Sequence, residues 1–228
     1  MMASHPGPPG ADLPTNDTGD KPMRPTPLAL ATAVALAALS SAALADDSHR
    51  ARSRFTLSSP DLASGVFDNS FVLNGFGCTG GNLSPELRWS NVPPGTQSLA
   101  LQVYDPDAPT GSDFWHWAVY NIPPTATGLP RGAGNSPATL PPGAFGGNTD
   151  FMDTGATNGN GSYGGPCPPV GDKPHRYVFT LYALAVPDVQ AAGGVPPTGT
   201  AALYGFVINK GLGPALLGKA SFTARYGR

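Results

Sequence analysis

In SLALQVYDPDAP, residues 98–109, apolar side chains occupy alternate positions until two prolines interrupt the pattern. Strict alternation of this kind is typical of a β-strand with one buried face. The side chains predicted on the buried face are Leu99, Leu101 and Val103. Because proline restricts the backbone, the end of the segment predicts a rigid turn. The strand therefore presents two carboxylates, Asp105 and Asp107, at its end.

Two further segments have the composition of strands. In residues 114–121 (FWHWAVYN), alternation predicts one face made of Trp115, Trp117 and Val119 and another made of His116, Ala118 and Tyr120. Residues 176–184 (RYVFTLYAL) are apolar at both parities, which predicts a strand inside a sheet. Weaker strand candidates are residues 55–57, 71–73, 87–89 and 220–226.

These short runs are separated by Gly and Pro clusters, which predicts a mainly β chain that folds as an antiparallel β-sandwich rather than as βαβ units. Helical patterning is strongest in residues 200–209 (TAALYGFVIN), which Gly211 and Gly213 would end, so we expect one or two short peripheral helices. Gly, Pro, Asn and Thr dominate residues 129–161, which predicts a long functional or mobile loop.

The composition excludes one class of partner. Thirteen basic and fifteen acidic residues give a formal net charge of −2, so the chain lacks the excess positive charge that binds a nucleic-acid backbone. Charged residues are only 12% of the chain, beside 30 Gly and 27 Pro, which agrees with many turns and few long helices.

The N-terminal region predicts export. Residues 23–45 (MRPTPLALATAVALAALSSAALA) combine an arginine, an apolar run and a small-residue end, as a secretory signal peptide does, with cleavage after Ala45. A membrane anchor is the alternative, but the apolar run is shorter than the ~20 residues that span a bilayer. We expect residues 1–22 to be disordered or to precede the true start, 46–53 to form a linker, and 54–228 to form the single domain of a periplasmic or secreted protein.

Cys78 and Cys167 are the two cysteines of the chain. In an oxidising compartment an even pair is more often bridged than free, which favours a disulfide; two separately buried thiols are the alternative. Neither His116 nor His175 lies at a zinc-finger spacing from them, so no metal site or cofactor is predicted.

His116 is the first candidate for chemistry. If the strands that contain Asp105 and His116 pair, the connection between them returns His116 toward the carboxylate, which would favour the imidazolium form and allow it to receive an anion. Two purely structural interpretations stay open. The carboxylates would belong to an ordinary Asp-Pro turn, and His116 would be a core histidine whose hydrogen bonds are satisfied among aromatic side chains.

A Gly- and Pro-rich loop, YGGPCPP at residues 163–169, is the second candidate. Its glycines would let the backbone approach a ligand and direct amide groups at an anion, although the same composition suits a plain turn. The chain has no Gly-x-Ser-x-Gly elbow, no His-Glu-x-x-His motif and no phosphate-binding loop of the Gly-x-x-x-x-Gly-Lys-Ser/Thr type.

Taken together, residues 77–109, 114–123 and 163–184 resemble the phosphatidylethanolamine-binding protein family, in particular its bacterial Raf-kinase-inhibitor-like branch. The resemblance implies a sandwich with a shallow pocket at one end that binds phosphate-like anions. The residues it assigns to this pocket are Asp105, Asp107 and His116 on the lining, Pro109 at the rim, Gly165 and Pro166 at a close backbone approach, and His175 and Tyr177 on a neighbouring strand.

The resemblance further implies that Arg176 is a structural ion-pair partner and that a Cys78–Cys167 bridge would staple the loop beside the pocket. One departure concerns residues 203–208 (LYGFVI), which lack the histidine that many bacterial members place after this glycine. We therefore carry over no role for this segment in closing the pocket.

The function expected is that of a non-enzymatic binding or inhibitory module for a small anion, such as phosphate or a phospholipid headgroup. One alternative is a phosphoester or ester hydrolase with His116 as general acid or base and Asp105 orienting it. Another is a protease inhibitor that inserts residues 129–161 into its target. A protein partner, if there is one, is not specified by any motif.

Overall fold

The computed structural model describes residues 53–152, 154–157 and 161–228. The predicted leader at 23–45, residues 1–22 and all but the last residue of the predicted linker lie outside the described residues. Arg52–Arg228 forms one compact unit. No helix in the described part of the chain is long and apolar enough to cross a membrane.

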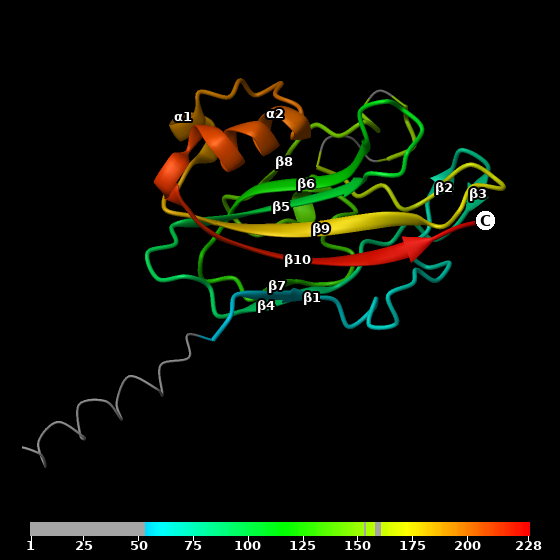
Figure 1. Ribbon diagram of the computed structural model, residues 1–228, viewed down its shortest axis with the longest axis horizontal. Helices are drawn as coiled ribbons and strands as arrows, with labels where there is room; N and C mark the ends of the chain where they lie inside the picture. The colour runs from blue at the N-terminus through cyan, green and yellow to red at the C-terminus, as the bar shows by residue number, and fades with distance from the viewer. Residues whose placement is uncertain (1–52, 153, 158–160) are drawn as a thin grey trace, which may run out of the picture. The chain divides into compact units, whose positions relative to one another are not determined.

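The unit is built from three antiparallel sheets (Figure 1). The large sheet has the order β10 (Leu216–Tyr226), β9 (His175–Leu184), β5 (Ser98–Asp105), β6 (Phe114–Ile122) and β8 (Phe145–Gly146). A smaller sheet has the order β1 (Thr56–Ser58), β4 (Leu87–Ser90) and β7 (Gly128–Leu129), and β2 (Asn74–Gly75) pairs with β3 (Cys78–Thr79). The strand predicted at residues 98–104 is β5, the central strand of the large sheet.

The main core fills the space between the large sheet and the β1–β4–β7 sheet (Figure 1). Leu99, Leu101 and Val103 all point into it and are almost completely buried, as the alternation predicts. Leu57 and Trp89 close the core from the smaller sheet. The mainly β fold, an antiparallel sandwich with few short helices, is confirmed.

Helices cover the other face of the large sheet, where a second apolar cluster forms (Figure 1). They are α1 (Val189–Gly193), α2 (Ala201–Phe206) and the π-helical turn η2 (Val207–Gly211). A 3₁₀ turn, η3 (Gly213–Ala215), follows η2, and another, η1 (Pro137–Thr139), lies in the loop after β7. The predicted 200–209 helix is present: Thr200 caps it by accepting a hydrogen bond from the Leu203 amide, and it packs on the sheet face through Tyr204.

The alternation predicted for residues 114–121 is confirmed from Trp117 to Tyr120 and is wrong at Trp115 and His116. Val103 of β5 faces Trp117 of β6, but the next residue, Tyr104, faces Trp115. The register shifts between these two pairs because a β-bulge adds one residue to β6. Trp117 enters the main core, and His116 beside it contacts the ring of Tyr177, another member of that core. Trp115 is displaced to the helix-covered face. The bulge therefore aims His116 into the end of the sandwich.

Of the weaker strand candidates, 55–57, 87–89 and 220–226 correspond to β1, β4 and β10, whereas 71–73 is not a strand. Its backbone groups bind loops instead: the Leu73 amide donates to the Pro166 carbonyl, and the Phe71 carbonyl accepts the Tyr163 hydroxyl. Residues 129–161 contain η1 and β8 and are otherwise loop where they are described.

Candidate functional site

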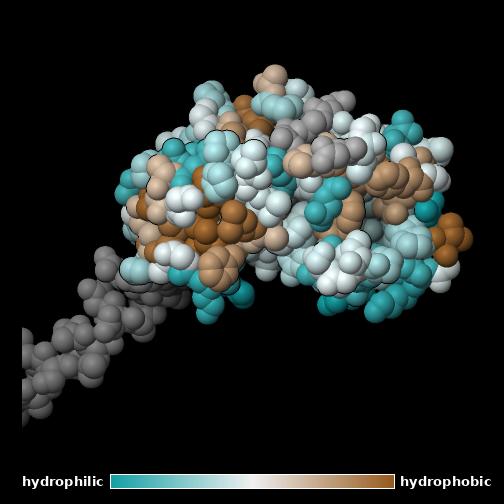
Figure 2. Space-filling model, turned by 90° about the horizontal axis from the view of Figure 1, so that it is seen from above, coloured by the Kyte–Doolittle hydropathy of each residue, from teal (hydrophilic) through white to brown (hydrophobic). Residues whose placement is uncertain are grey.

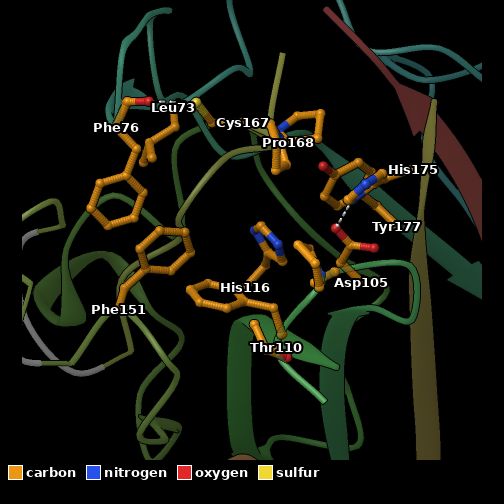
Figure 3. A pocket seen from close by; sticks show the side chains of 14 residues that line it. Leu73, Phe76, Asp105, Thr110, His116, Phe151, Cys167, Pro168, His175 and Tyr177 are labelled. Carbon is orange, nitrogen blue, oxygen red and sulfur yellow. Dashed lines mark hydrogen bonds and ion pairs between the residues drawn. The ribbon is translucent and has the colours of Figure 1, made fainter. Parts of the chain in front are cut away.

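A small pocket lies at the end of the large sheet where β5 ends and β6 and β9 begin (Figure 3). Its volume is about 140 Å³. The polar side chains that line it are those of Asp105, Thr110, His116, His175 and Tyr177. The remaining walls are mainly apolar and come from Leu73, Phe76, Ala108, Pro109, Phe114, Phe151, Pro168 and Pro169. Three strand ends and two loops therefore meet around a small, mostly apolar space.

Asp105 is held by two hydrogen bonds at the floor of this pocket. Its Oδ2 lies 2.7 Å from Nδ1 of His175, and its Oδ1 accepts from the Asp107 amide at 2.8 Å. The two side chains of the Asp105–His175 pair are almost completely buried. On the outer side, Nε2 of His175 lies 3.3 Å from a carboxylate oxygen of Asp172. The structure thus pairs Asp105 with His175, not with His116.

Asp107 does not line the pocket, contrary to what the resemblance implies. Its carboxylate accepts from Nε of Arg176 at 2.9 Å, from Nη2 at 3.0 Å and from the Arg176 amide at 2.9 Å, and Lys173 lies 3.6 Å away. The hydrogen bond from the Arg176 side chain is the main reason that the pKa of Asp107 lies well below its ordinary value. Asp107 fixes the turn after β5 to β9, and Arg176 is the ion-pair partner that was expected.

His116 points into the pocket from the bulge in β6 (Figure 3). Its Nδ1 lies 2.8 Å from the Gly164 carbonyl, and because a carbonyl can only accept, Nδ1 carries the hydrogen. Burial lowers the pKa of His116 from 6.5, and this effect outweighs the opposite influence of the Asp105 charge. The expectation of an imidazolium in the free protein is therefore wrong: desolvation favours the neutral ring.

The Gly/Pro loop approaches the protein's own backbone, not the pocket. A Cβ at Gly165 would lie 2.2 Å from the Phe71 carbonyl oxygen, so only glycine fits there. The Gly165 amide donates to Oδ1 of Asn82 at 2.8 Å, and the Pro166 carbonyl accepts from Leu73. Neither Gly165 nor Pro166 is among the lining residues. The predicted anion cradle of free amides is not formed at these two residues.

The disulfide between Cys78 and Cys167 is present. It joins β3 to the loop at residues 163–169, and Cys167 itself lines the pocket together with the two prolines that follow it. The thiol alternative is thereby set aside. Pro109, His175 and Tyr177 also lie on the lining, where the resemblance places them.

Two wall residues, Phe76 and Phe151, were not found from the sequence. Their rings stack with centroids 5.9 Å apart, and Phe151 also meets the rings of Phe114 and His116 edge to face. The only available signal for Phe151 was an isolated aromatic residue within a Gly-rich loop. Asn82 was missed as well, although its positive φ of 47° and its bonds to the Tyr163 carbonyl and the Gly165 amide organise the Gly/Pro loop.

Comparison with known proteins identifies the family of this fold. A sequence model described as "Phosphatidylethanolamine-binding protein" matches residues 63–226. The chain belongs to this family. Within the phosphatidylethanolamine-binding proteins, it is 47% identical to the protein YbcL of Escherichia coli K12 over 157 residues, which is 68% of this chain and 80% of YbcL.

A second relative is YbhB of E. coli K12, which is 40% identical over 154 residues, 67% of this chain and 90% of YbhB. The crystal structure of E. coli YbcL, described as a new member of the mammalian phosphatidylethanolamine-binding family, superimposes with a TM-score of 0.65 at 41% identity. That match covers 77% of this chain and 99% of YbcL. Within the residues of the present chain that the structure describes, no three or more potential metal ligands lie close enough together to hold a metal ion.

Proposed function

We propose that this protein is an exported, non-enzymatic binding module that takes a phosphate-like anion, free or as a small ester headgroup, into the pocket around His116. The observation that carries the proposal is the orientation of His116. Because Nδ1 donates to the Gly164 carbonyl, the lone pair of the neutral ring lies on Nε2, and the side chain points into the pocket. A ligand that brings a proton, or binds together with one, satisfies this atom.

Tyr177 supplies a second polar contact. Its hydroxyl is buried and has no hydrogen-bond partner in the described part of the chain. Burial is the main cause that raises its pKa, so the phenol stays protonated at any physiological pH and remains a donor. A buried donor without a partner costs about 1–3 kcal/mol. An anionic oxygen between Tyr177 and a protonated His116 would recover that cost.

The size of the pocket sets the size of the ligand. A volume of about 140 Å³ is small beside the ~300–1,000 Å³ of pockets that enclose drug-sized molecules. It suits a phosphate or a short phosphate ester, but not an acyl chain. The apolar walls lower the local dielectric constant, which strengthens each hydrogen bond made to a charged ligand.

The chemistry of the lining supports binding rather than turnover. Cys167 is bridged to Cys78 and cannot act as a thiolate, and the Thr110 hydroxyl donates to the Asp113 carbonyl at 2.5 Å. Asp105 binds His175 and the turn after β5, so it does not orient His116 as a hydrolase mechanism would require.

Calorimetric titration of the purified protein with inorganic phosphate and with O-phosphorylethanolamine tests this function. We expect saturable binding of at least one of them and a loss of affinity of tenfold or more in His116→Ala. Asp172→Asn is the matched control, because it changes a carboxylate near His175 that is outside the lining. Absence of binding by both anions, or unchanged affinity in His116→Ala, contradicts the proposal.

Export rests on the sequence of residues 23–45. We expect the protein recovered outside the cytoplasm to begin at Asp46, and intact-mass measurement of that form checks the cleavage site. A mass that includes residues 23–45 would instead favour the anchor alternative.

A further inference from the structure

A second hollow lies on the opposite face of the large sheet, beside α2 and η2. Its volume is about 590 Å³, and it shares no lining residue with the His116 pocket. Neighbouring residues of the same strands supply the two sites: Tyr104 lines this groove and Asp105 the pocket, while Trp115 lines this groove and His116 the pocket. The groove therefore has its own surface and its own chemistry.

Aromatic side chains form the walls of the groove. The rings of Tyr104 and Trp115 lie 5.1 Å apart at an angle of 34°, on the sheet side. On the helix side, the side chain of Phe206 lines the groove and is 66% exposed. Figure 2 shows apolar side chains gathered on the side of the molecule where the helices lie. Planar apolar surfaces thus face the groove from both of its sides.

The floor of the groove contains an acceptor without a donor. Gln102 is 1% exposed, and its Nε2 donates to the Tyr120 hydroxyl at 2.9 Å and to the Ala201 carbonyl at 2.7 Å. These two bonds fix the carboxamide so that Oε1 turns toward Gly205, and Oε1 has no partner among the described residues. A buried carbonyl oxygen left unpaired is costly, so the site favours a ligand that brings an O–H or N–H donor.

The charged residues that line the groove favour neither an anion nor a cation. Lys219 and Asp113 are the charged residues of the groove and have opposite signs. Lys219 already donates to the side chain of Asn209 at 3.1 Å. The rest of the polar lining is neutral and includes the hydroxyl-bearing side chains of Thr180 and Ser221. A neutral ligand with several hydroxyl groups matches this set of donors and acceptors.

We propose that the groove is a second ligand site, and that it binds a neutral saccharide. A pyranose ring combines an apolar face, which can stack on Trp115, Tyr104 or Phe206, with hydroxyl donors that can reach Gln102 Oε1. The two charged residues of the groove have opposite signs, and the rest of its polar lining is neutral, which favours a neutral ligand over an ion. The two sites therefore take different classes of ligand and are independent of each other.

Two-dimensional NMR of the indole N–H groups tests the proposal directly. The chain has three tryptophans. The indole nitrogen of Trp89 donates to the Ala126 carbonyl and that of Trp117 to the Gly161 carbonyl, so these two report on the fold. The indole of Trp115 lines the groove. We expect titration with cellotriose, maltotriose or N,N′,N″-triacetylchitotriose to shift the Trp115 signal, assigned with Trp115→Phe, and to leave the other two in place.

Two variants locate the ligand. In Gly205→Ala the new methyl group would stand 3.3 Å from Gln102 Oε1 and block it, while alanine remains a good helix former. In Phe206→Ser an exposed wall is removed with little effect on packing. We expect tenfold weaker saccharide binding in the first and several-fold weaker binding in the second, with the Trp89 and Trp117 signals unchanged. No response of Trp115 to any of the three saccharides, or undiminished binding in both variants, overturns the proposal.

Discussion

The two carboxylates at the end of β5 make structural contacts, whereas His116 points into the pocket. Asp105 and Asp107 are two positions apart, yet each carboxylate has a different partner: Asp105 binds the buried His175, and Asp107 binds the exposed Arg176. His116 is left without a carboxylate partner and stays neutral because it is buried. The Asp105–His175 pair is therefore distinct from His116, the residue to which we assign the anion.

The buried Asp105–His175 pair is expected to matter for stability. Removing one partner of such a pair leaves a buried polar group uncompensated, which costs about 1–3 kcal/mol and more where the group is charged. We expect Asp105→Ala to lower the free energy of unfolding by about 3 kcal/mol in urea denaturation. Asp172→Ala, whose side chain is 41% exposed, is the control and should cost less than about 1 kcal/mol. An equal decrease in the free energy of unfolding in the two variants would show that the buried pair contributes no more to stability than the exposed Asp172 does.

The neutral state of His116 predicts how anion affinity depends on pH. Its pKa in the free protein lies below 6.5 because of burial, and a bound anion would raise it. Between these two pKa values binding takes up a proton, so affinity should fall as the pH rises, by up to tenfold per pH unit. Sulfate is the suitable probe because phosphate esters themselves titrate near pH ~6.

Calorimetry with sulfate at a series of pH values should show this slope in the native protein and none in His116→Gln. A sulfate affinity that rises with pH, or the same slope in the variant, would assign the titrating group elsewhere.

At the scale of elements, a bulge and a disulfide assemble the pocket. The bulge in β6 turns His116 to the side of Trp117 and so takes it out of regular alternation. The Cys78–Cys167 bridge joins β3 to the 163–169 loop, whose carbonyl at Gly164 orients His116. The loop thus positions His116 through its backbone carbonyl at Gly164, whereas the Gly165 amide binds Asn82.

Removal of the disulfide is expected to affect stability and binding together. The bridge closes 89 residues of chain, and loss of a bridge of this kind typically costs about 2–4 kcal/mol. We expect the double variant Cys78→Ala/Cys167→Ala to unfold at lower urea concentration and to bind phosphate more weakly, because Gly164 loses its support. Reduction of the native protein with dithiothreitol provides the comparison. Unchanged phosphate affinity in a destabilised variant would separate the two roles.

At the scale of the whole molecule, the large sheet separates two sites. One face packs on the small sheet, and the other face is only partly covered by helices (Figure 1). The His116 pocket lies at the end of the first face, and the groove beside Phe206 lies on the second. Adjacent strand residues point to opposite faces, so a single strand serves both sites. The pocket and the groove have no lining residue in common, so we expect ligands at the two proposed sites not to compete.

Binding at the pocket should stabilise the entire domain. A ligand that binds only the folded state adds about 2.7 kcal/mol when its concentration is ~100 times its Kd. For a domain of this size we expect phosphate at that level to raise Tm by about 5–10 °C in differential scanning calorimetry. His116→Ala should lose most of this shift, whereas Phe206→Ser should retain it. A shift of equal size in His116→Ala would place the phosphate outside the pocket.

Much of the architecture was predictable from local sequence. Alternation in residues 98–104, apolar runs at 176–184 and Thr200 before an apolar segment each report a local preference, and they became β5, β9 and α2. The pocket residues Asp105, His116, His175 and Tyr177 could be named through the resemblance to a family, since their motifs are contiguous in the chain.

Three features depended on contacts between distant segments, and only the tertiary structure decided them. Whether Asp105 meets His116 or His175 depends on strand register, and the bulge that sets this register leaves no signature in the alternation of residues 114–121. The charge state of His116 depends on how completely other segments bury it. The groove beside Gln102 exists because α2 covers only part of a sheet face. The local sequence specifies the strand that contains Asp105. The hydrogen-bond partner of its carboxylate depends on burial and strand pairing, because these result from contacts throughout the fold.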